Sequence, residues 1–417
     1  MNQLCRTSIN FLKLFTSLYI FIYCFPFPAS YIPYGYEFFS KYVEALKAKF
    51  TLFFGREILG FIDLKYIAMN GSGDTTVDYI ALISYATLGF LVALILYFFV
   101  RKHDHINRLY NWMIIYARYF VGLTLISYGV VKFLQGQFPS MSLIALESTY
   151  GESSPMGLAW RFFGYSDLYK GFMGVSEILA GFLLLFRRTA ILGALVSIAV
   201  CTNIFIVNLA FDVPVKLFSG HLLFFSILIL LPSLKALFGF FILHQQVRIK
   251  PTLYFFNTKW KKGAYIAAKI ILVGLIPLSL AVGHVRSQSF RTFLNEWEGV
   301  YEVISFEIEN KPGLSESAHW DKIFIQGKTI MTLNKAKTKN YYTIEHIWNE
   351  GEINFIESQE QEDPYRFILT ELEDGNYKIH GEISSNKYQI TAKRKLKKDY
   401  LLMNRGFHWV NELPFNR

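Results

Sequence analysis

The chain has 417 residues, of which 53% are hydrophobic, 18% aromatic and only 18% charged. Soluble globular chains carry about a quarter charged residues, so this composition excludes an ordinary soluble protein and predicts an integral membrane protein. The net charge of +10 does not indicate nucleic-acid binding: residues before 288 carry 25 Lys and Arg against 12 Asp and Glu, whereas the remainder carries 17 against 20. The basic excess belongs to the membrane part, where loop cations set orientation.

Apolar runs of about 20 residues, the length that crosses the ~30 Å hydrocarbon core, predict seven transmembrane helices. They lie near residues 8–25, 77–100, 111–134, 170–186, 190–211, 220–243 and 264–285. The first run resembles a signal peptide, but Lys13 interrupts it and no small-residue cleavage site follows, which favours an uncleaved helix. Residues 35–69 interleave apolar and charged side chains, which fits an amphipathic helix on the membrane or the bundle, or an ordinary loop helix.

The loops predict the orientation of the helices. Lys and Arg gather between helices two and three, four and five, and six and seven, and the positive-inside rule makes these loops cytoplasmic. Loops 135–169 and 212–219 and the chain beyond 286 then face outward. This arrangement predicts a bacterial inner-membrane protein with a periplasmic C-terminal domain.

From Trp297 onward, eight short runs rich in Tyr, Ile, Phe and Thr alternate with turn signals such as Asp374-Gly375-Asn376. This pattern predicts eight antiparallel strands in a small barrel or sandwich, and Trp297-Glu298-Gly299 loosely resembles the start of a lipocalin-type barrel. The predicted fold is therefore mainly α: a transmembrane bundle followed by a small β domain. The predicted parts are 1–110 with two helices and an outer loop helix, 111–243 with a four-helix core, 244–287 with a basic loop and the last helix, and the extracytoplasmic β domain 288–417.

Charged residues inside the helices are the clearest functional signal. Arg118 and Lys132 lie on the third helix and Glu177 on the fourth, and a charge at the centre of a membrane helix costs about 2.5–3.5 kcal/mol on insertion scales. If these helices are antiparallel neighbours, Glu177 pairs with Arg118 or with Lys132, and the sequence does not choose. The charges either lock the bundle, line an outward-opening site or mark a transport pathway.

The predicted ligand-binding residues lie on these two helices, on the sixth helix and in the loops between helices. They are Arg118, Tyr128, Lys132, Gln137, Glu177, Asp212, Lys216 and His221. His221 alone also fits an interface histidine with satisfied hydrogen bonds. Loop 135–169 is rich in aromatic residues, which predicts a lid over the mouth of the bundle, with a packing role as the alternative. No spacing typical of a metal site, a phosphate-binding loop or a hydrolase nucleophile is found, so no metal is predicted.

Residues 112–241 resemble the DoxX family of four-helix membrane proteins, in a form typical of Bacteroidetes. The residues that carry the resemblance are Arg118-x-x-x-Gly122, Tyr128-Gly129-x-x-Lys132-Phe133, Gln135-Gly136-Gln137-Phe138-Pro139, Ser154-Pro155-Met156-Gly157, Glu177-x-x-x-Gly181, Asp212-Val213-Pro214-Val215-Lys216 and His221-Leu222-Leu223. Some members are associated with thiosulfate:quinone oxidoreduction or membrane redox complexes. The resemblance therefore implies a quinone near Lys132, Glu177 and His221. It also implies a redox partner or a diffusible quinone, because the chain lacks a flavin motif.

Two other functions remain open. The first is a non-catalytic scaffold whose β domain recruits or stabilises an envelope protein partner. The second is a solute transporter, which would favour an inverted repeat that the sequence does not show. The aromatic terminus Arg405–Arg417 is predicted either to dock on the outer mouth of the membrane domain or to pack on its own domain. In every interpretation the lipid bilayer is a partner.

Overall fold

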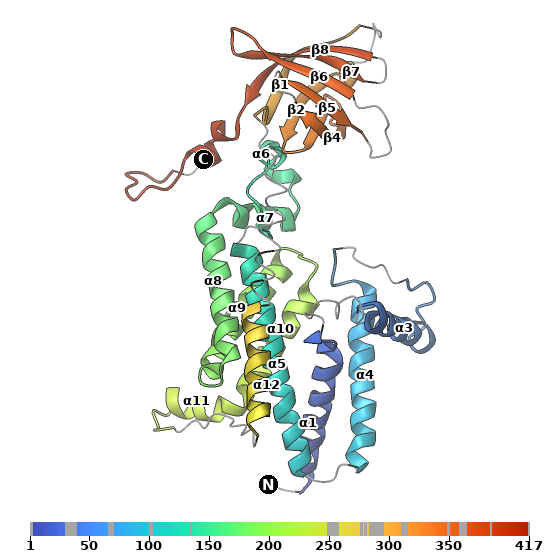
Figure 1. Ribbon diagram of the computed structural model, residues 1–417, viewed down its shortest axis with the longest axis vertical. Coiled ribbons are helices and arrows are strands. Elements are labelled where there is room, and N and C mark those ends of the chain that lie inside the picture. The colour runs from blue at the N-terminus through green and yellow to red at the C-terminus, as the bar shows by residue number, and fades with distance from the viewer. Residues whose placement is uncertain are drawn as a thin grey trace. The chain divides into compact units, whose positions relative to one another are not determined.

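The protein was analysed as a computed structural model, shown in Figure 1. It describes residues 3–29, 40–65, 71–99, 103–133, 136–247, 258–275, 278, 282, 296–309, 316–347, 351–357, 365–383 and 386–415. The chain divides into two compact units. One comprises Met1–Pro139 and Ser154–Val285, and the other comprises Ser140–Ser153 and Arg286–Arg417.

The first unit is helical. Its helices are α1 Gln3–Cys24, α3 Ala45–Phe53, α4 Thr76–Phe99, α5 His103–Phe133, α7 Pro155–Tyr165, α8 Asp167–Leu185, α9 Ala190–Ala210, α10 Lys216–Leu230, α11 Leu234–Phe241 and α12 Lys259–Ile270. Within the described residues, six spans are long and apolar enough to cross a membrane: one each in α1, α4, α5, α8 and α9, and one that runs through α10 and α11. The predicted helix 264–285 begins in α12, and most of its second half lies outside the described residues.

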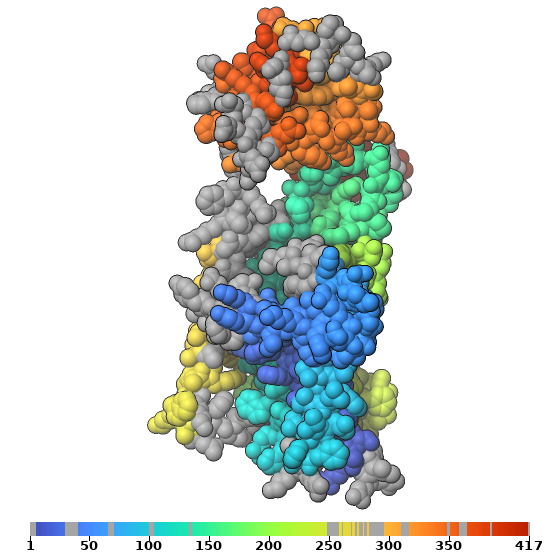
Figure 2. All heavy atoms as spheres, turned by 90° about the vertical axis from the view of Figure 1, so that its right-hand side faces the viewer, coloured from blue at the N-terminus to red at the C-terminus, as the bar shows by residue number. Residues whose placement is uncertain are grey.

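The predicted helix in 35–69 forms as α3, with flanking π-helical turns at Ser40–Glu44 and Phe54–Ile58. It packs against α4 (Figure 2), where Phe54, Leu64 and Ile80 form a buried apolar cluster. The Lys47 ammonium group donates hydrogen bonds to the backbone carbonyls of Tyr23 and Phe25, at the C-terminal end of α1. Helix α3 is therefore held both by apolar packing and by a cation at a helix C-terminus.

Glycines set the separation between α5 and α8, which lie side by side in Figure 1. A Cβ atom added to Gly181 would lie 2.3 Å from the carbonyl oxygen of Gly122, and one added to Gly129 would lie 2.5 Å from that of Gly174. Small residues at these positions let the two backbones touch, as is common between membrane helices. This close approach brings the C-terminal end of α5 against α8.

An aspartate ahead of α4 caps α10. The carboxylate of Asp74 accepts hydrogen bonds from the backbone N–H of Lys216 at 2.7 Å and from that of Leu217 at 2.8 Å. These are donors of the first turn of α10, which lack partners within the helix. The loop before α4 is thereby fixed to the turn between α9 and α10, although the two are distant in sequence.

The second unit is a closed antiparallel barrel in which each strand pairs with the next and β1 pairs with β8. Its strands are β1 Gly299–Ile308, β2 Trp320–Gln326, β3 Thr329–Asn334, β4 Lys339–Ile347, β5 Glu352–Ile356, β6 Tyr365–Glu371, β7 Asn376–Ile383 and β8 Asn386–Lys395. Alternating apolar residues from the strands, including Tyr301, Ile344 and Phe355, form its buried core. The mainly helical fold and the eight-stranded β domain are confirmed, and the β domain is a barrel rather than a sandwich.

A short helix, α6 (Leu143–Glu147), belongs to the barrel unit although it lies between α5 and α7 in sequence. Leu143 is buried with Val300 and Phe324. The Glu147 carboxylate accepts hydrogen bonds from Lys322, from Lys395 at 2.9 Å and from the Tyr400 hydroxyl at 2.5 Å. The middle of the loop that was predicted as a lid is therefore anchored on the barrel. The chain enters the barrel unit before α6 and returns to the helical unit after it.

Burial alone would raise the pKa of Glu147, but the hydrogen bonds from Lys322, Tyr400 and Lys395 outweigh burial and lower the pKa to about 2. The ionised carboxylate therefore stabilises the fold above the ordinary carboxyl pKa of about 4.3, and this contribution is lost as pH falls from there toward 2. Glu302, which lies 3.8 Å from Lys322, is one acidic neighbour of this cluster. Asp321 and Asp399 are others.

We expect Glu147→Gln to speed hydrogen exchange in β1 and β2 at pH 7, because Lys322 and Lys395 lose their charged acceptor. The difference from wild type should shrink as pH approaches 2. Glu309→Gln is the matched control, since the pair of Glu309 with Lys387 is exposed and exposed pairs contribute about 0–1 kcal/mol. Equal exchange in wild type and Glu147→Gln at pH 7 would contradict the anchoring role of Glu147.

Candidate functional site

A buried ion pair joins α5 to α8. The Lys132 ammonium nitrogen lies 2.8 Å from one carboxylate oxygen of Glu177 and 2.9 Å from the other, and the two side chains are 6% and 3% exposed. The ring of Tyr128 lies 5.5 Å from the ammonium nitrogen and that of Phe138 lies 5.9 Å from it. Of the two partners predicted for Glu177, the structure places Lys132 against it.

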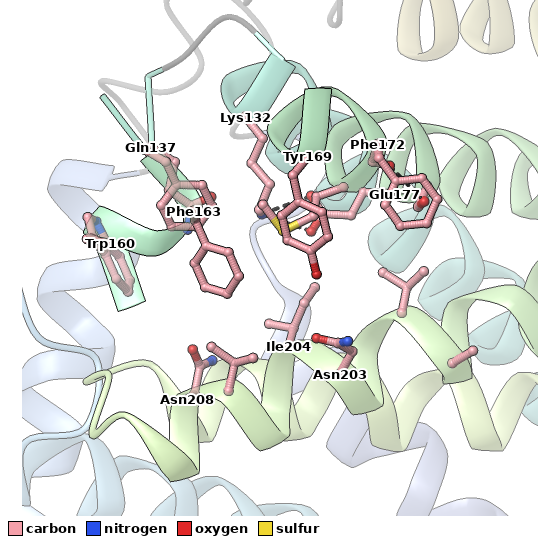
Figure 3. Close-up of a pocket in the computed structure, with 16 residues that line it drawn as sticks. Lys132, Gln137, Trp160, Phe163, Tyr169, Phe172, Glu177, Asn203, Ile204 and Asn208 are labelled. Carbon is pink, nitrogen blue, oxygen red and sulfur yellow. Dashed lines mark hydrogen bonds and ion pairs between the residues drawn. The ribbon is translucent and has the colours of Figure 1, made fainter. Parts of the chain in front are cut away.

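Beside this pair lies a cavity of about 270 Å³. Figure 3 shows Lys132, Tyr169 and Glu177 along one wall, with Asn203, Ile204 and Asn208 of α9 facing them across the cavity. Further wall comes from α7 and from the chain just after α5. The aromatic lining residues are Phe138, Trp160, Phe163, Tyr169 and Phe172. The cavity is therefore mainly apolar, with a few polar groups that converge on it, as is typical of small-molecule sites.

The polar groups differ in how they are satisfied. The Asn208 amide nitrogen donates to the Ser219 hydroxyl at 2.9 Å. Asn203 and Gln137 also line the cavity, and neither amide makes a hydrogen bond to a described residue. Two amides thus remain available to a ligand beside the Lys132–Glu177 pair.

Two further predicted site residues on α5 do not line the cavity. Arg118 lies 14 positions before Lys132, about 21 Å along the helix, and its guanidinium lies 5.3 Å from the Tyr119 ring. It is 7% exposed, and its Nε has no hydrogen-bond partner among the described residues. Tyr128 touches Lys132 from outside the cavity, and its ring packs on Phe218.

Asp212 and Lys216 lie at the turn between α9 and α10, also outside the cavity wall. The Lys216 ammonium lies 2.9 Å from a carboxylate oxygen of Asp212, whose side chain is 84% exposed. With Asp74 nearby at 3.7 Å, these charges satisfy one another at the end of the helices. Their placement fits a structural role.

His221 faces α1. The Tyr19 hydroxyl donates to its Nε2 at 2.6 Å, its Nδ1 donates to the Leu217 carbonyl at 2.6 Å, and its ring stacks on Tyr23 with centroids 4.2 Å apart. Both ring nitrogens are used, so His221 acts as a satisfied interface histidine, the second of the two interpretations of this residue.

Asn203, Tyr169 and Met173 line the cavity, but none of them is among the predicted ligand-binding residues. Asn203 is detectable as a polar residue inside an apolar span, whereas the other two look like ordinary lipid-facing or packing residues. The aromatic loop contributes through its two ends, with Phe138 on one side and Trp160 and Phe163 on the other.

Comparison with known proteins finds the uncharacterized protein YwoB of Bacillus subtilis (strain 168), which is 36% identical over 124 residues. The match covers 30% of this chain and 79% of YwoB. No family model and no solved structure matches the chain.

Proposed function

This chain belongs to the family of the uncharacterized protein YwoB, and on that premise we propose that it is an inner-membrane protein that binds a lipid-soluble ligand, such as a quinone or quinol, beside Lys132 and Glu177. The observation that carries the proposal is the buried Lys132–Glu177 pair in the wall of a cavity. Ionisable residues within membrane helices are rare because they are costly to bury, and many of them line substrate, ion or ligand sites. A binding role therefore accounts for the pair and the cavity together.

The size and lining of the cavity support a ring-shaped ligand. Pockets for drug-sized molecules hold about 300–1,000 Å³, and this cavity of about 270 Å³ lies just below that range. It suits a head group rather than a whole lipid. Aromatic walls provide stacking surfaces, and Lys132, Gln137 and Asn203 provide donors for ring oxygens.

We also propose that the helical unit belongs to the DoxX family. Lys132 and Glu177, two residues that carry the resemblance, meet in the bundle at the cavity wall. A quinone bound here would link the protein to the electron carriers of the membrane through a redox partner, with the barrel unit on the periplasmic side.

The proposal is tested by a mass-spectrometric inventory of lipids and quinones that co-purify with the protein. We expect the wild type to retain a quinone, and Lys132→Met/Glu177→Leu to lose it while remaining folded. Lys216→Gln is the matched control, because it removes a lysine charge outside the cavity. If only bulk phospholipid co-purifies with the wild type, the quinone proposal fails.

A second candidate, a scaffold for an envelope protein, is favoured by the chain end that follows the last strand. Phe407, Trp409, Val410 and Leu413 are 76%, 92%, 73% and 80% exposed. Exposed aromatic residues in one short segment are typical of contact surfaces. On this account, truncation after Asn404 abolishes function in the native host, whereas the stable variant Lys132→Met/Glu177→Leu leaves it intact; the reverse result rejects the scaffold.

A further inference from the structure

Asn203 is placed unusually for an asparagine. It lies within α9, Ala190–Ala210, the most apolar of the six candidate spans among the described residues. The residue is exposed on the outer surface of the bundle, yet it also lines the cavity. Its amide has no hydrogen-bond partner among the described residues. An unsatisfied amide at membrane depth is costly, so a function that uses it is expected.

The residues around Asn203 form an opening of the cavity between α8 and α9. Phe172 and Ala199 line the cavity and are exposed, Phe172 by 65%, and Ser176 lines it as a half-buried residue. The Ser176 hydroxyl donates to the Phe172 carbonyl of its own helix, so it is already satisfied. Because α8 and α9 are both candidate membrane spans, an opening between them faces the hydrocarbon region rather than water.

The two polar walls face each other. Figure 3 shows Lys132 and Glu177 on one side of the cavity and Asn203 on the other, with aromatic and aliphatic side chains between them. A ligand that satisfies both walls needs acceptor atoms at opposite ends of a flat apolar ring. One acceptor meets the Lys132 ammonium, and the other meets the Asn203 amide N–H.

We infer that the ligand enters sideways from the bilayer between α8 and α9, and that Asn203 binds its second ring oxygen. The inference rests on the proposed function and names the ligand class more closely: a ring with oxygen atoms at opposite positions, as in a 1,4-quinone, whose apolar chain remains in the lipid at the opening. Gln137 lies in the chain just after α5, so it is not part of this opening.

Two measurements on the purified full-length protein in lipid nanodiscs test the inference. The first is the affinity of Asn203→Leu for a 1,4-quinone that lacks the isoprenoid chain. We expect about tenfold weaker binding, which corresponds to one lost hydrogen bond of about 1.4 kcal/mol. Thr202→Leu is the matched control, because Thr202 is the exposed neighbour on α9 that does not line the cavity; it should bind like the wild type.

The second measurement uses a quinone with a photoreactive group at the end of its isoprenoid chain. We expect adducts on lipid-facing residues beside the opening, such as Leu179 and Ile206, which are 49% and 54% exposed. Adducts on the loop residues 136–153 instead would overturn lateral entry. Unchanged affinity in Asn203→Leu would overturn the role of Asn203. Failure of the wild type to bind either probe would contradict the proposed function itself.

Discussion

Lys132→Ala is expected to destabilise the helical unit by about 3–5 kcal/mol, because it leaves the Glu177 carboxylate buried without a cation. Lys132 and Glu177 are only 6% and 3% exposed, so bulk water does not solvate the carboxylate in place of the lost partner. Replacement of both residues in Lys132→Met/Glu177→Leu should restore most of the stability, since apolar pairs of similar volume often substitute for buried ion pairs without loss. The unfolding temperatures of the wild type and of both variants are measured in detergent from the loss of the helical circular dichroism signal on heating.

This comparison separates a structural role of the ion pair from a ligand-binding role. If the ion pair only stabilises the bundle, the double variant should match the wild type both in unfolding temperature and in ligand retention. A binding pair makes the double variant stable but unable to retain the ligand. Lys216→Ala controls for the loss of a lysine, and its exposed pair with Asp212 should contribute no more than about 1 kcal/mol. Equal unfolding temperatures for wild type and Lys132→Ala would contradict the buried bridge.

Gly181→Ala is expected to be the most damaging single-methyl change on α8. The added Cβ would lie 2.3 Å from the carbonyl oxygen of Gly122, so α5 and α8 must move apart, at about 1–3 kcal/mol for an overpacked interface. The same shift loosens the Lys132–Glu177 contact. We therefore expect both a lower unfolding temperature and weaker ligand retention.

Gly171→Ala is the matched control on the same helix. A Cβ at Gly171 meets nothing within 4 Å, so this change should keep or improve stability, because Ala is favoured over Gly in a helix by roughly 0.5–1 kcal/mol. If Gly181→Ala were as stable as Gly171→Ala, the close helix contact between α5 and α8 would be wrong.

The elements of the fold were predictable because their signals are local. Runs of about 20 apolar residues mark the spans, and alternating strands broken by turns such as Asp374-Gly375-Asn376 mark the eight strands. The choice of a barrel depended on the pairing of β1 with β8, which no local pattern records. The anchoring of Glu147 among barrel lysines was also hidden, because it joins residues 175 or more positions apart.

The site was predictable in part. Charge inside the helices pointed to Lys132 and Glu177, and helical spacing narrowed the partner of Glu177 to two residues. The choice between Arg118 and Lys132 required the offset of α8 along α5, which the contacts of Gly122 with Gly181 and of Gly129 with Gly174 fix. His221 does not line the cavity and instead hydrogen-bonds to Tyr19 of α1. These residues are 202 positions apart, so no local sequence pattern predicts the contact.

The most direct test of the central claim is a titration of the purified protein with a short-chain quinone, in which the tryptophan fluorescence is recorded at each quinone concentration. Trp160 is the tryptophan that lines the cavity, so a quinone bound there should quench its emission. We predict saturable quenching in the wild type that is largely removed in Trp160→Phe. Linear quenching without saturation, or saturable quenching of the same amplitude in Trp160→Phe, would contradict a quinone site in this cavity.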